Sequence, residues 1–251
     1  MPLDFEVLCP LIEGAIDRLA IAYRRTPGLF LTEEDLRSGL IRRLQRLRGL
    51  GRPLPSQDRA IRAVPVHAQL PWYDEDWKLS IFPDITIIEP EHLSILHGCA
   101  IARPSPPRNA ASNRRRPYTQ QRLVIDPFVG PSSFCSFPRD SGGLRRPIWP
   151  PLPSKGFEFC GKAITLELKF ARRGLKNGLM GLEADFNKMR RLFGILDSRY
   201  QGHDIFSYVV LFDKYRQSSS ERALTTFLGK HGRGNRHRII YKPGSLARRT
   251  R

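Results

Sequence analysis

The sequence predicts an α/β fold in which helices flank a mixed central sheet. Two amphipathic helical patterns open the chain, and a strand, a helix and a strand follow one another over residues 163–212. Between these parts lie short runs rich in β-branched residues. A chain of 251 residues buries a sizeable core without disulfides. We therefore expect one α/β domain over residues 1–213, interrupted by an insertion at 103–155.

Two helices are expected before the first strand. Apolar residues recur at helical spacing from Phe5 to Leu19, and Pro27-Gly28 ends that pattern. Thr32 is a predicted N-cap with Asp35 three residues later, which is the pattern of a capping box. The second helix therefore begins after Thr32, and its leucine stripe faces the core.

Two strands are expected after these helices. Residues 63–70 alternate well enough for a strand, and Pro65 favours an edge position because proline cannot donate to a strand ladder. Residues 79–88 read as a second strand, and its last four residues are β-branched throughout.

The second half of the domain predicts a crossover unit. Residues 163–170 form a nearly continuous apolar strand, and residues 205–212 have the composition of a fully buried one. Between them, apolar residues of 179–196 step by three and four, as in an amphipathic helix. This order predicts a right-handed crossover and parallel pairing of the two strands.

The net charge of +18 lies in two segments. Residues 103–155 hold ten Arg or Lys, two Asp and eleven Pro, which predicts a long loop with a possible short strand at 123–125. Residues 214–251 hold eleven Arg or Lys and one Glu, and predict a basic extension with a helix at 221–228, a loop at 230–238 and a strand at 239–242. Charge of this sign favours nucleic acid or an anionic membrane surface as partner.

Several classes of protein are excluded by pattern. The longest apolar run, 205–212, has eight residues, far fewer than the ~20 needed to span a bilayer. The start of the chain lacks the charged and apolar regions of a signal peptide. The four cysteines lie far apart, which argues against a zinc ribbon or a disulfide scaffold. A cytoplasmic protein with reduced thiols is expected.

Charged side chains occur where the strands should be buried. Glu167 and Lys169 lie within the strand 163–170, and alternation puts them on the same side. Ionised groups inside a domain are costly unless they are paired or bound to a metal. Asp84 opens the apolar run 85–88, and Glu33 lies in the first turn of the second helix beside its core-facing stripe. Glu34 is the alternative helix acid if that helix is rotated.

This ordered set resembles the PD-(D/E)xK nuclease superfamily, the fold of many restriction endonucleases and junction resolvases. The matching residues are Glu33, Pro83-Asp84 and Glu167-Leu168-Lys169, and the resemblance covers about residues 30–90 and 160–213. It implies a restriction-endonuclease-like core and a metal-dependent nuclease. These nucleases usually have a short hairpin between the two motifs, and the insertion accounts for the longer separation here if it loops out.

The residue types suit phosphodiester hydrolysis. Mg²⁺ or Mn²⁺ prefers carboxylate oxygens, so Asp84 and Glu167 would be direct ligands, with the carbonyl of Leu168 as a third. Lys169 could orient the attacking water or hold it deprotonated. Glu33 could bind a second metal or a metal-bound water.

Two other acids compete with this set, Asp126 with Asp84 and Asp76 with Glu167. Asp126 follows an apolar run, but Pro127 stops that strand and the insertion surrounds it. Asp76 and Lys78 form a rival Asp-x-Lys pattern in a polar stretch before Asp84, which we set aside.

Arginines in the two basic segments are the predicted nucleic-acid contacts. They are Arg114, Arg115, Arg116, Arg233, Arg236 and Arg238. The alternative is that both runs are solvated charge. His231 and His237 are not expected to bind metal, because no further soft ligand accompanies them.

The sequence therefore predicts a Mg²⁺- or Mn²⁺-dependent nuclease that acts on nucleic acid, with DNA as the expected substrate and no membrane partner. A catalytically inactive nucleic-acid-binding protein with the same fold is one alternative. A structural or adaptor subunit of a larger complex is another alternative. A homodimer is also compatible with the sequence.

Overall fold

The computed structural model describes residues 4–56, 62–70, 72–73, 80–94, 123–125, 157–159, 162–171, 175–199, 205–215 and 221–246. The expected insertion at 103–155 lies outside these residues, except for the short strand 123–125. Asp76, Lys78, Asp126 and the arginines 114–116 also lie outside them.

A six-stranded mixed sheet forms the centre of the fold. Its strand order is β12-β13-β11-β10-β6-β3. The strands are β12 (Arg233–Gly234), β13 (His237–Lys242), β11 (Ile205–Asp213), β10 (Ala163–Ala171), β6 (Ile85–Ile88) and β3 (Val66–Ala68). β10, β11 and β13 are parallel, whereas β6 runs antiparallel to β10 and β3 runs antiparallel to β6. The expected α/β class and the parallel pairing of β10 with β11 are confirmed.

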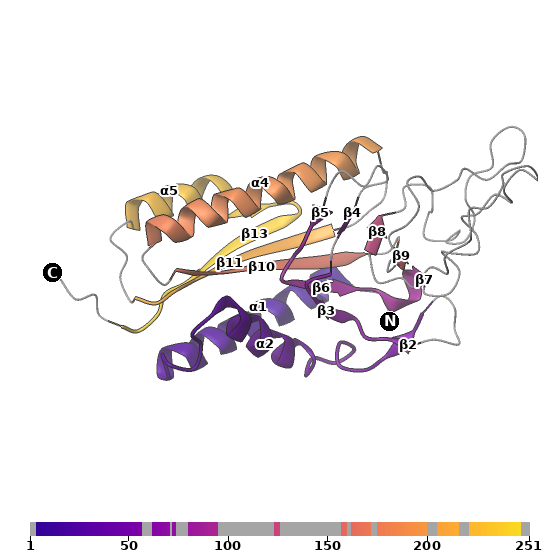
Figure 1. Cartoon of the computed structure of the whole chain (residues 1–251), viewed down its shortest axis with the longest axis horizontal. Helices are drawn as coiled ribbons and strands as arrows, with labels where there is room; N and C mark the ends of the chain where they lie inside the picture. The colour runs from indigo at the N-terminus through magenta and orange to yellow at the C-terminus, as the bar shows by residue number, and fades with distance from the viewer. Residues whose placement is uncertain are drawn as a thin grey trace, which may run out of the picture.

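Helices cover both faces of this sheet (Figure 1). In the part of the chain that the structure describes, α1 (Phe5–Arg25) and α2 (Glu33–Leu44) pack on one face, and α4 (Leu175–Arg199) and α5 (Glu221–His231) pack on the other. Alternate residues of β11 serve the two cores, with Tyr208 and Val210 facing α1 and α2, and Val209 and Leu211 facing α4 and α5.

Smaller elements complete the described chain. A second sheet has the order β5-β4-β8-β9-β7, and β1 pairs with β2 alone. Their bounds are β1 (Leu54–Pro55), β2 (Arg62–Ala63), β4 (Trp72–Tyr73), β5 (Ser80–Ile81), β7 (Leu93–Ser94), β8 (Leu123–Ile125), β9 (Phe157–Phe159) and the 3₁₀ helix η1 (Pro90–His92). The short strand expected at 123–125 is thus present as β8.

The prediction of one continuous strand over 79–88 was wrong. The segment divides into β5 and β6, which belong to different sheets, and residues 82–84 separate them. Pro83 cannot donate a ladder hydrogen bond, so the pairing stops there. The strand expected over 63–70 is likewise divided into β2 and β3, which belong to different sheets, and Pro65 lies between them. The edge position that Pro65 favoured is nevertheless the position of β3, which is the terminal strand of the central sheet.

The central sheet continues beyond residue 213, where the domain was expected to end. β13 adds six residues parallel to β11, and its Ile239 is buried in the core beneath α5. Part of the expected basic loop is instead a short hairpin of β12 and β13. Residues 221–242 of the basic C-terminal segment therefore contribute to the sheet and to the helix layer.

No helix in the described residues combines the length and the apolar character needed to cross a membrane.

Candidate active site

The site lies where β10 extends beyond its neighbour β6. β6 pairs only with residues 163–166 of β10, so the backbone of the remaining residues lacks a strand partner on that side among the described elements. Side chains take the place of the strand. Leu168 N–H donates to Asp84 Oδ2 at 2.8 Å, and Phe170 N–H donates to Glu33 Oε1 at 3.1 Å. Two of the predicted acids are therefore fixed by capping the open edge of β10.

The backbone of Asp84 is also fixed. Gln69 N–H donates to the Asp84 carbonyl at 3.0 Å, which ties the residue to the segment that follows β3. In a strand, the N–H and C=O of one residue point to the same side. The carbonyl of Leu168 therefore faces the same open edge as its N–H, towards Asp84. This direction is the one that a backbone metal ligand at this place would need.

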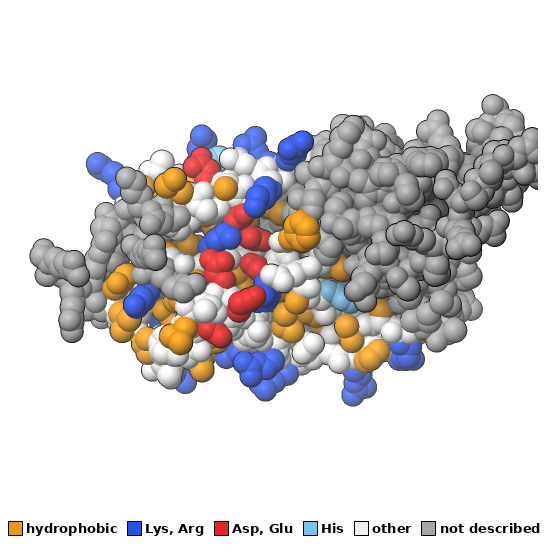
Figure 2. Space-filling model, viewed as in Figure 1, with side chains coloured by type: hydrophobic (Ala, Val, Ile, Leu, Met, Phe, Trp, Pro, Cys, Tyr) orange, Lys and Arg blue, Asp and Glu red, His pale blue; other side chains and the backbone are white. Residues whose placement is uncertain are grey.

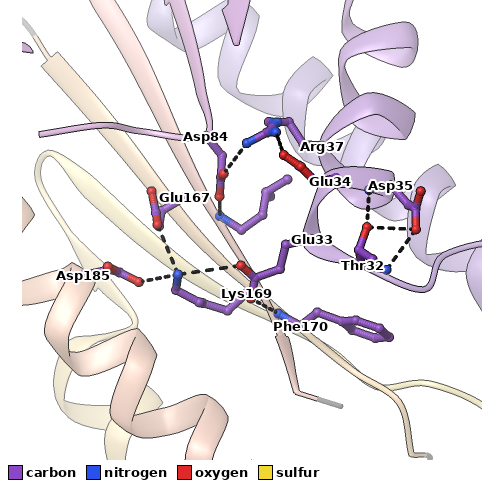
Figure 3. A network of polar contacts seen from close by, with 11 residues as sticks. Thr32, Glu33, Glu34, Asp35, Arg37, Asp84, Glu167, Lys169, Phe170 and Asp185 are labelled. Carbon is purple, nitrogen blue, oxygen red and sulfur yellow. Dashed lines mark hydrogen bonds and ion pairs between the residues drawn. The ribbon is translucent and has the colours of Figure 1, made fainter. Parts of the chain in front are cut away.

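Lys169 links the acids of three elements (Figure 3). Its Nζ lies 3.3 Å from Glu167 Oε1 on the same strand and 4.0 Å from Glu33 Oε2 on α2. Asp185 Oδ2 on α4 lies 3.0 Å from the same nitrogen. The structure thus brings together Glu33, Asp84, Glu167 and Lys169, which the sequence analysis had selected from distant positions.

The sequence reasoning placed Asp185 on the polar side of its helix and gave it no role in the site, but the structure buries it there. Its side chain is only 8 % exposed, and its other carboxylate oxygen contacts Lys188 Nζ at 3.1 Å. An Asp three residues before a Lys is an ordinary surface pair on a helix. No sequence signal separated this Asp from such a pair, because its burial depends on how α4 packs over β10.

Glu33, and not Glu34, is the helix acid that reaches Lys169. Glu34 is 63 % exposed and forms an ion pair with Arg37. Arg37 in turn contacts Asp84 Oδ1 at 3.1 Å, and is itself well buried. The sequence analysis did not assign a role to Arg37, which here links the first turns of α2 to the strand that begins after Asp84.

The capping box sets the position of Glu33. Thr32 Oγ1 accepts from Asp35 N–H at 3.1 Å, and Asp35 Oδ2 accepts from Thr32 N–H at 2.9 Å. This reciprocal pair confirms the predicted helix start and fixes the first helical residue, which is Glu33.

The site holds more carboxyl groups than cationic side chains that could neutralise them. Burial, together with the nearby Asp84 and Asp185, raises the pKa of Glu167 to about 7 against the opposing effect of Lys169. Burial also raises the pKa of Asp84, although Leu168 N–H and Arg37 counteract it. Burial alone would lower the pKa of Lys169, but Asp185, Glu167 and Glu33 raise it above its usual value. Lys169 is therefore an ammonium ion at neutral pH.

The donor set fits a hard divalent cation. Asp84 and Glu167 offer carboxylate oxygens beside a backbone carbonyl, and their raised pKa values mean that added positive charge would stabilise the ionised forms. These acids do not form a closed cage. Within the described ranges, the group of three ligand-type side chains whose atoms all lie within 4.8 Å of one another is Glu89, Glu91 and His92, away from this site. The ammonium of Lys169 lies among the acids instead.

The predicted nucleic-acid contacts of the C-terminal segment have different surroundings. Arg233 is exposed on β12, and Arg236 is partly buried at the turn before β13. Arg238 forms an ion pair with Glu13 of α1, and its guanidinium lies 5.9 Å from the Phe206 ring centroid. Arg238 therefore joins β13 to α1.

Figure 2 shows acidic side chains gathered in the middle of the visible face, with basic side chains among them and along the margins. Comparisons of the chain with protein-family models, with curated proteins and with solved structures each find no match.

Proposed function

We propose that the protein is a metal-dependent nuclease of the PD-(D/E)xK type, which hydrolyses phosphodiester bonds in nucleic acid, with DNA as the expected substrate. The observation that carries the proposal is the convergence of Glu33, Asp84, Glu167 and Lys169, four residues separated by up to half the chain, on one open strand edge. A structural ion pair would account for Glu167 and Lys169, and capping of the strand edge would account for Glu33 and Asp84. Neither role by itself requires all four residues to lie together.

The carboxylates would hold the metal. Asp84 and Glu167, with the carbonyl of Leu168, supply the hard oxygen ligands for Mg²⁺ or Mn²⁺, and Glu33 would bind a second ion or a metal-bound water. The bound ion would lower the pKa of water and stabilise the charge that develops on the phosphate. Because Glu167 titrates near neutral pH, metal binding would release a proton and strengthen as the pH rises to about 7.

Lys169 would act as a fixed positive charge. Its raised pKa keeps it protonated, so it donates hydrogen bonds to the attacking water or to a phosphate oxygen, and does not accept a proton. Asp185 positions this ammonium from α4 and shares its own charge with the exposed Lys188. The substrate would compete with Glu33 and Glu167 for the ammonium.

A cleavage assay with amide variants tests the proposal. Glu167→Gln and Asp84→Asn keep the shape of the side chains and remove the ligand charge, so both should lose cleavage of linear and supercoiled DNA in millimolar Mg²⁺ or Mn²⁺. Glu183→Gln, an exposed change two residues from Asp185 on α4, should cut like the wild type.

A metal titration of stability supplies an independent readout. The melting temperature of the wild type should rise in millimolar Mg²⁺ or Mn²⁺, because a ligand stabilises only the folded state that binds it. The melting temperature of Glu167→Gln should rise much less. Unchanged cleavage by both amide variants would refute the site. A wild type that neither cuts DNA or RNA nor responds to either metal would favour the non-enzymatic alternative.

A further inference from the structure

A pocket of about 520 Å³ lies on the α1–α2 pair, apart from the candidate active site. Four arginines surround it: Arg18 of α1, Arg42 and Arg43 of α2, and Arg46 just after α2. Leu29, Phe30 and Leu47 supply its apolar lining. The pocket therefore combines positive charge with an apolar surface, and its volume lies within the range of ordinary ligand sites.

The arginines of this pocket have no acidic partner among the described residues. Arg43 donates to the Gly39 carbonyl at 2.9 Å, and Arg42 to the Ser38 carbonyl at 3.4 Å. Three acids on the same two helices pair elsewhere, Glu13 with Arg238, Asp17 with Lys242, and Glu34 with Arg37. The positive charge of the pocket is thus left for an external anion.

The guanidinium groups also repel one another. Burial lowers the pKa of Arg43, and the charges of Arg42, Arg46 and Arg18 lower it further. Basic residues in the last turn of a helix are favoured by the helix dipole. That effect explains Arg42 and Arg43, but it does not explain Arg18, in the middle of α1, or Arg46, beyond the end of α2.

We propose that this pocket binds a nucleotide unit of a nucleic-acid strand, with a phosphate on the arginines and the base against the apolar lining and the guanidinium planes. Guanidinium groups bind phosphate oxygens through paired N–H donors, and their planes stack on unpaired bases. A flat bilayer surface would contact only the rim of a hollow site, so a strand fits the shape better than a membrane does.

This inference rests on the proposed function for the identity of the strand as substrate. α2 joins the two sites, since Glu33 begins the helix and Arg43 lies ten residues further along it. At 1.5 Å per residue that separation is about 15 Å. A fully stacked strand advances about 3.4 Å per nucleotide and an unpaired strand advances further, so at most about four to five nucleotides would span it. The pocket would hold the substrate strand a few nucleotides from the scissile bond.

Binding of a fluorescein-labelled single-stranded DNA of about 12 nucleotides, followed by anisotropy without divalent metal, tests the proposal. The test variant is Arg42→Gln with Arg46→Gln, because both side chains are exposed. The matched control is Arg24→Gln with Arg25→Gln, which removes the same charge from exposed positions at the end of α1, outside the pocket. Melting curves check that both variants fold. If the test variant does not fold, Arg18→Gln and Arg24→Gln replace the two pairs.

The pocket variant should raise the Kd by roughly tenfold or more at about 100 mM salt. Its log–log salt slope should shrink by about 1.4, at about 0.7 per phosphate contact on a single strand, while the control changes Kd by less than about threefold. Equal losses in the two variants would overturn the proposal, because general electrostatics would explain them. Loss of binding to vesicles of anionic phospholipid, with unchanged affinity for DNA, would overturn it in favour of a membrane surface.

The two proposals fail in different ways. If the wild type cuts DNA but the pocket and control variants bind alike, the pocket proposal fails and the nuclease proposal stands. If no metal supports cleavage but the pocket variant alone loses affinity, the nuclease proposal fails and the nucleotide site stands.

Discussion

The two ends of α2 hold charge in opposite ways. At its first turn, Glu33 joins acids from β10, α4 and the start of β6, and Lys169 and Arg37 are the cations placed among them. At its last turn, arginines from α1 and α2 gather around an apolar pocket, and no acid in the described part of the chain pairs with them. At the acidic end the charged side chains contact one another. At the basic end the arginines have no acidic partner within the described residues.

This difference shows that a region with zero net charge can still have separate acidic and basic surfaces. Outside the two basic segments the chain carries 21 basic and 21 acidic residues. The helices separate these charges in space, so that the described body has its own basic surface. A strand bound to the arginines would therefore be directed along α2 towards the acids, where a metal would be needed to offset their repulsion.

The largest expected effect is the loss of chemistry at the acidic end. If the protein is a nuclease as proposed, Lys169→Met should lower the cleavage rate by about 10²–10⁴-fold at saturating metal and substrate, because it removes the charge assigned to the attacking water. Single-turnover cleavage measures this. Lys188→Met is the matched control, since that exposed lysine contacts the other oxygen of Asp185. Similar losses in both variants would mean that the lysine at 169 acts only by pairing with Asp185.

The next effect concerns stability against pH without metal. Glu167 has a pKa of about 7 in the folded protein and about 4.5 when unfolded, so unfolding releases a proton between these values. Wild type should therefore lose stability as the pH rises from about 4.5 to 7, by at most about 3 kcal/mol from this group. Urea unfolding at pH 5 and pH 8 measures the loss. Glu167→Gln should show a smaller one, and an identical pH dependence in the two proteins would contradict the assigned pKa.

A smaller effect separates the two helix acids. Glu33→Gln should lower cleavage by roughly 10–100-fold, because an amide cannot supply a metal or its bound water with a full charge. Glu34→Gln should change it by less than about threefold, since Glu34 is exposed and its ion pair among the described residues is with Arg37. Steady-state rates at several Mg²⁺ concentrations distinguish them. A larger loss in Glu34→Gln would mean that α2 presents the other acid when substrate is bound.

The smallest effect lies in the helix cap. Thr32→Ala removes the hydroxyl that caps Asp35 N–H and should cost about 1 kcal/mol of stability. Chemical denaturation measures the cost, and Ser at the same position should restore most of it. Any DNA affinity measured for the proposed nucleotide pocket at the far end of α2 should be unchanged in this variant. A parallel loss of affinity would show that the two ends of the helix are not independent.

The sequence predicted most of the elements and four residues of the site because both depend on local patterns. Apolar spacing located α1, α2 and α4, and charges inside an apolar strand identified Glu167 and Lys169. These signals depend on the free energy of burying each side chain, which follows from the residue type and can therefore be read from the sequence.

The remaining features depend on packing. Asp185 and Arg37 carry ordinary helix patterns, and only the contact of their helices with β10 and β6 gives them a role. The sequence pattern did not identify the pocket arginines, because the net charge was taken over a long stretch of the chain in which acidic residues balance them. A shorter window would have found them, since residues 36–62 hold eight Arg and one Asp. β13 was predicted as part of an extension outside the domain, because the sequence of a six-residue strand does not show which strand it pairs with.

The edge of β10 that Asp84 and Glu33 cap has a consequence for aggregation. An exposed strand edge is a template for another strand, and natural proteins obstruct such edges with charged side chains. Here the obstruction consists of the acids proposed for the chemistry, held by Leu168 N–H and Phe170 N–H. Loss of these acids to alanine would open the edge to intermolecular pairing, whereas amide replacements would keep it covered. The same carboxylates would then protect the folded chain from self-association in any cell that has no substrate for it to cut.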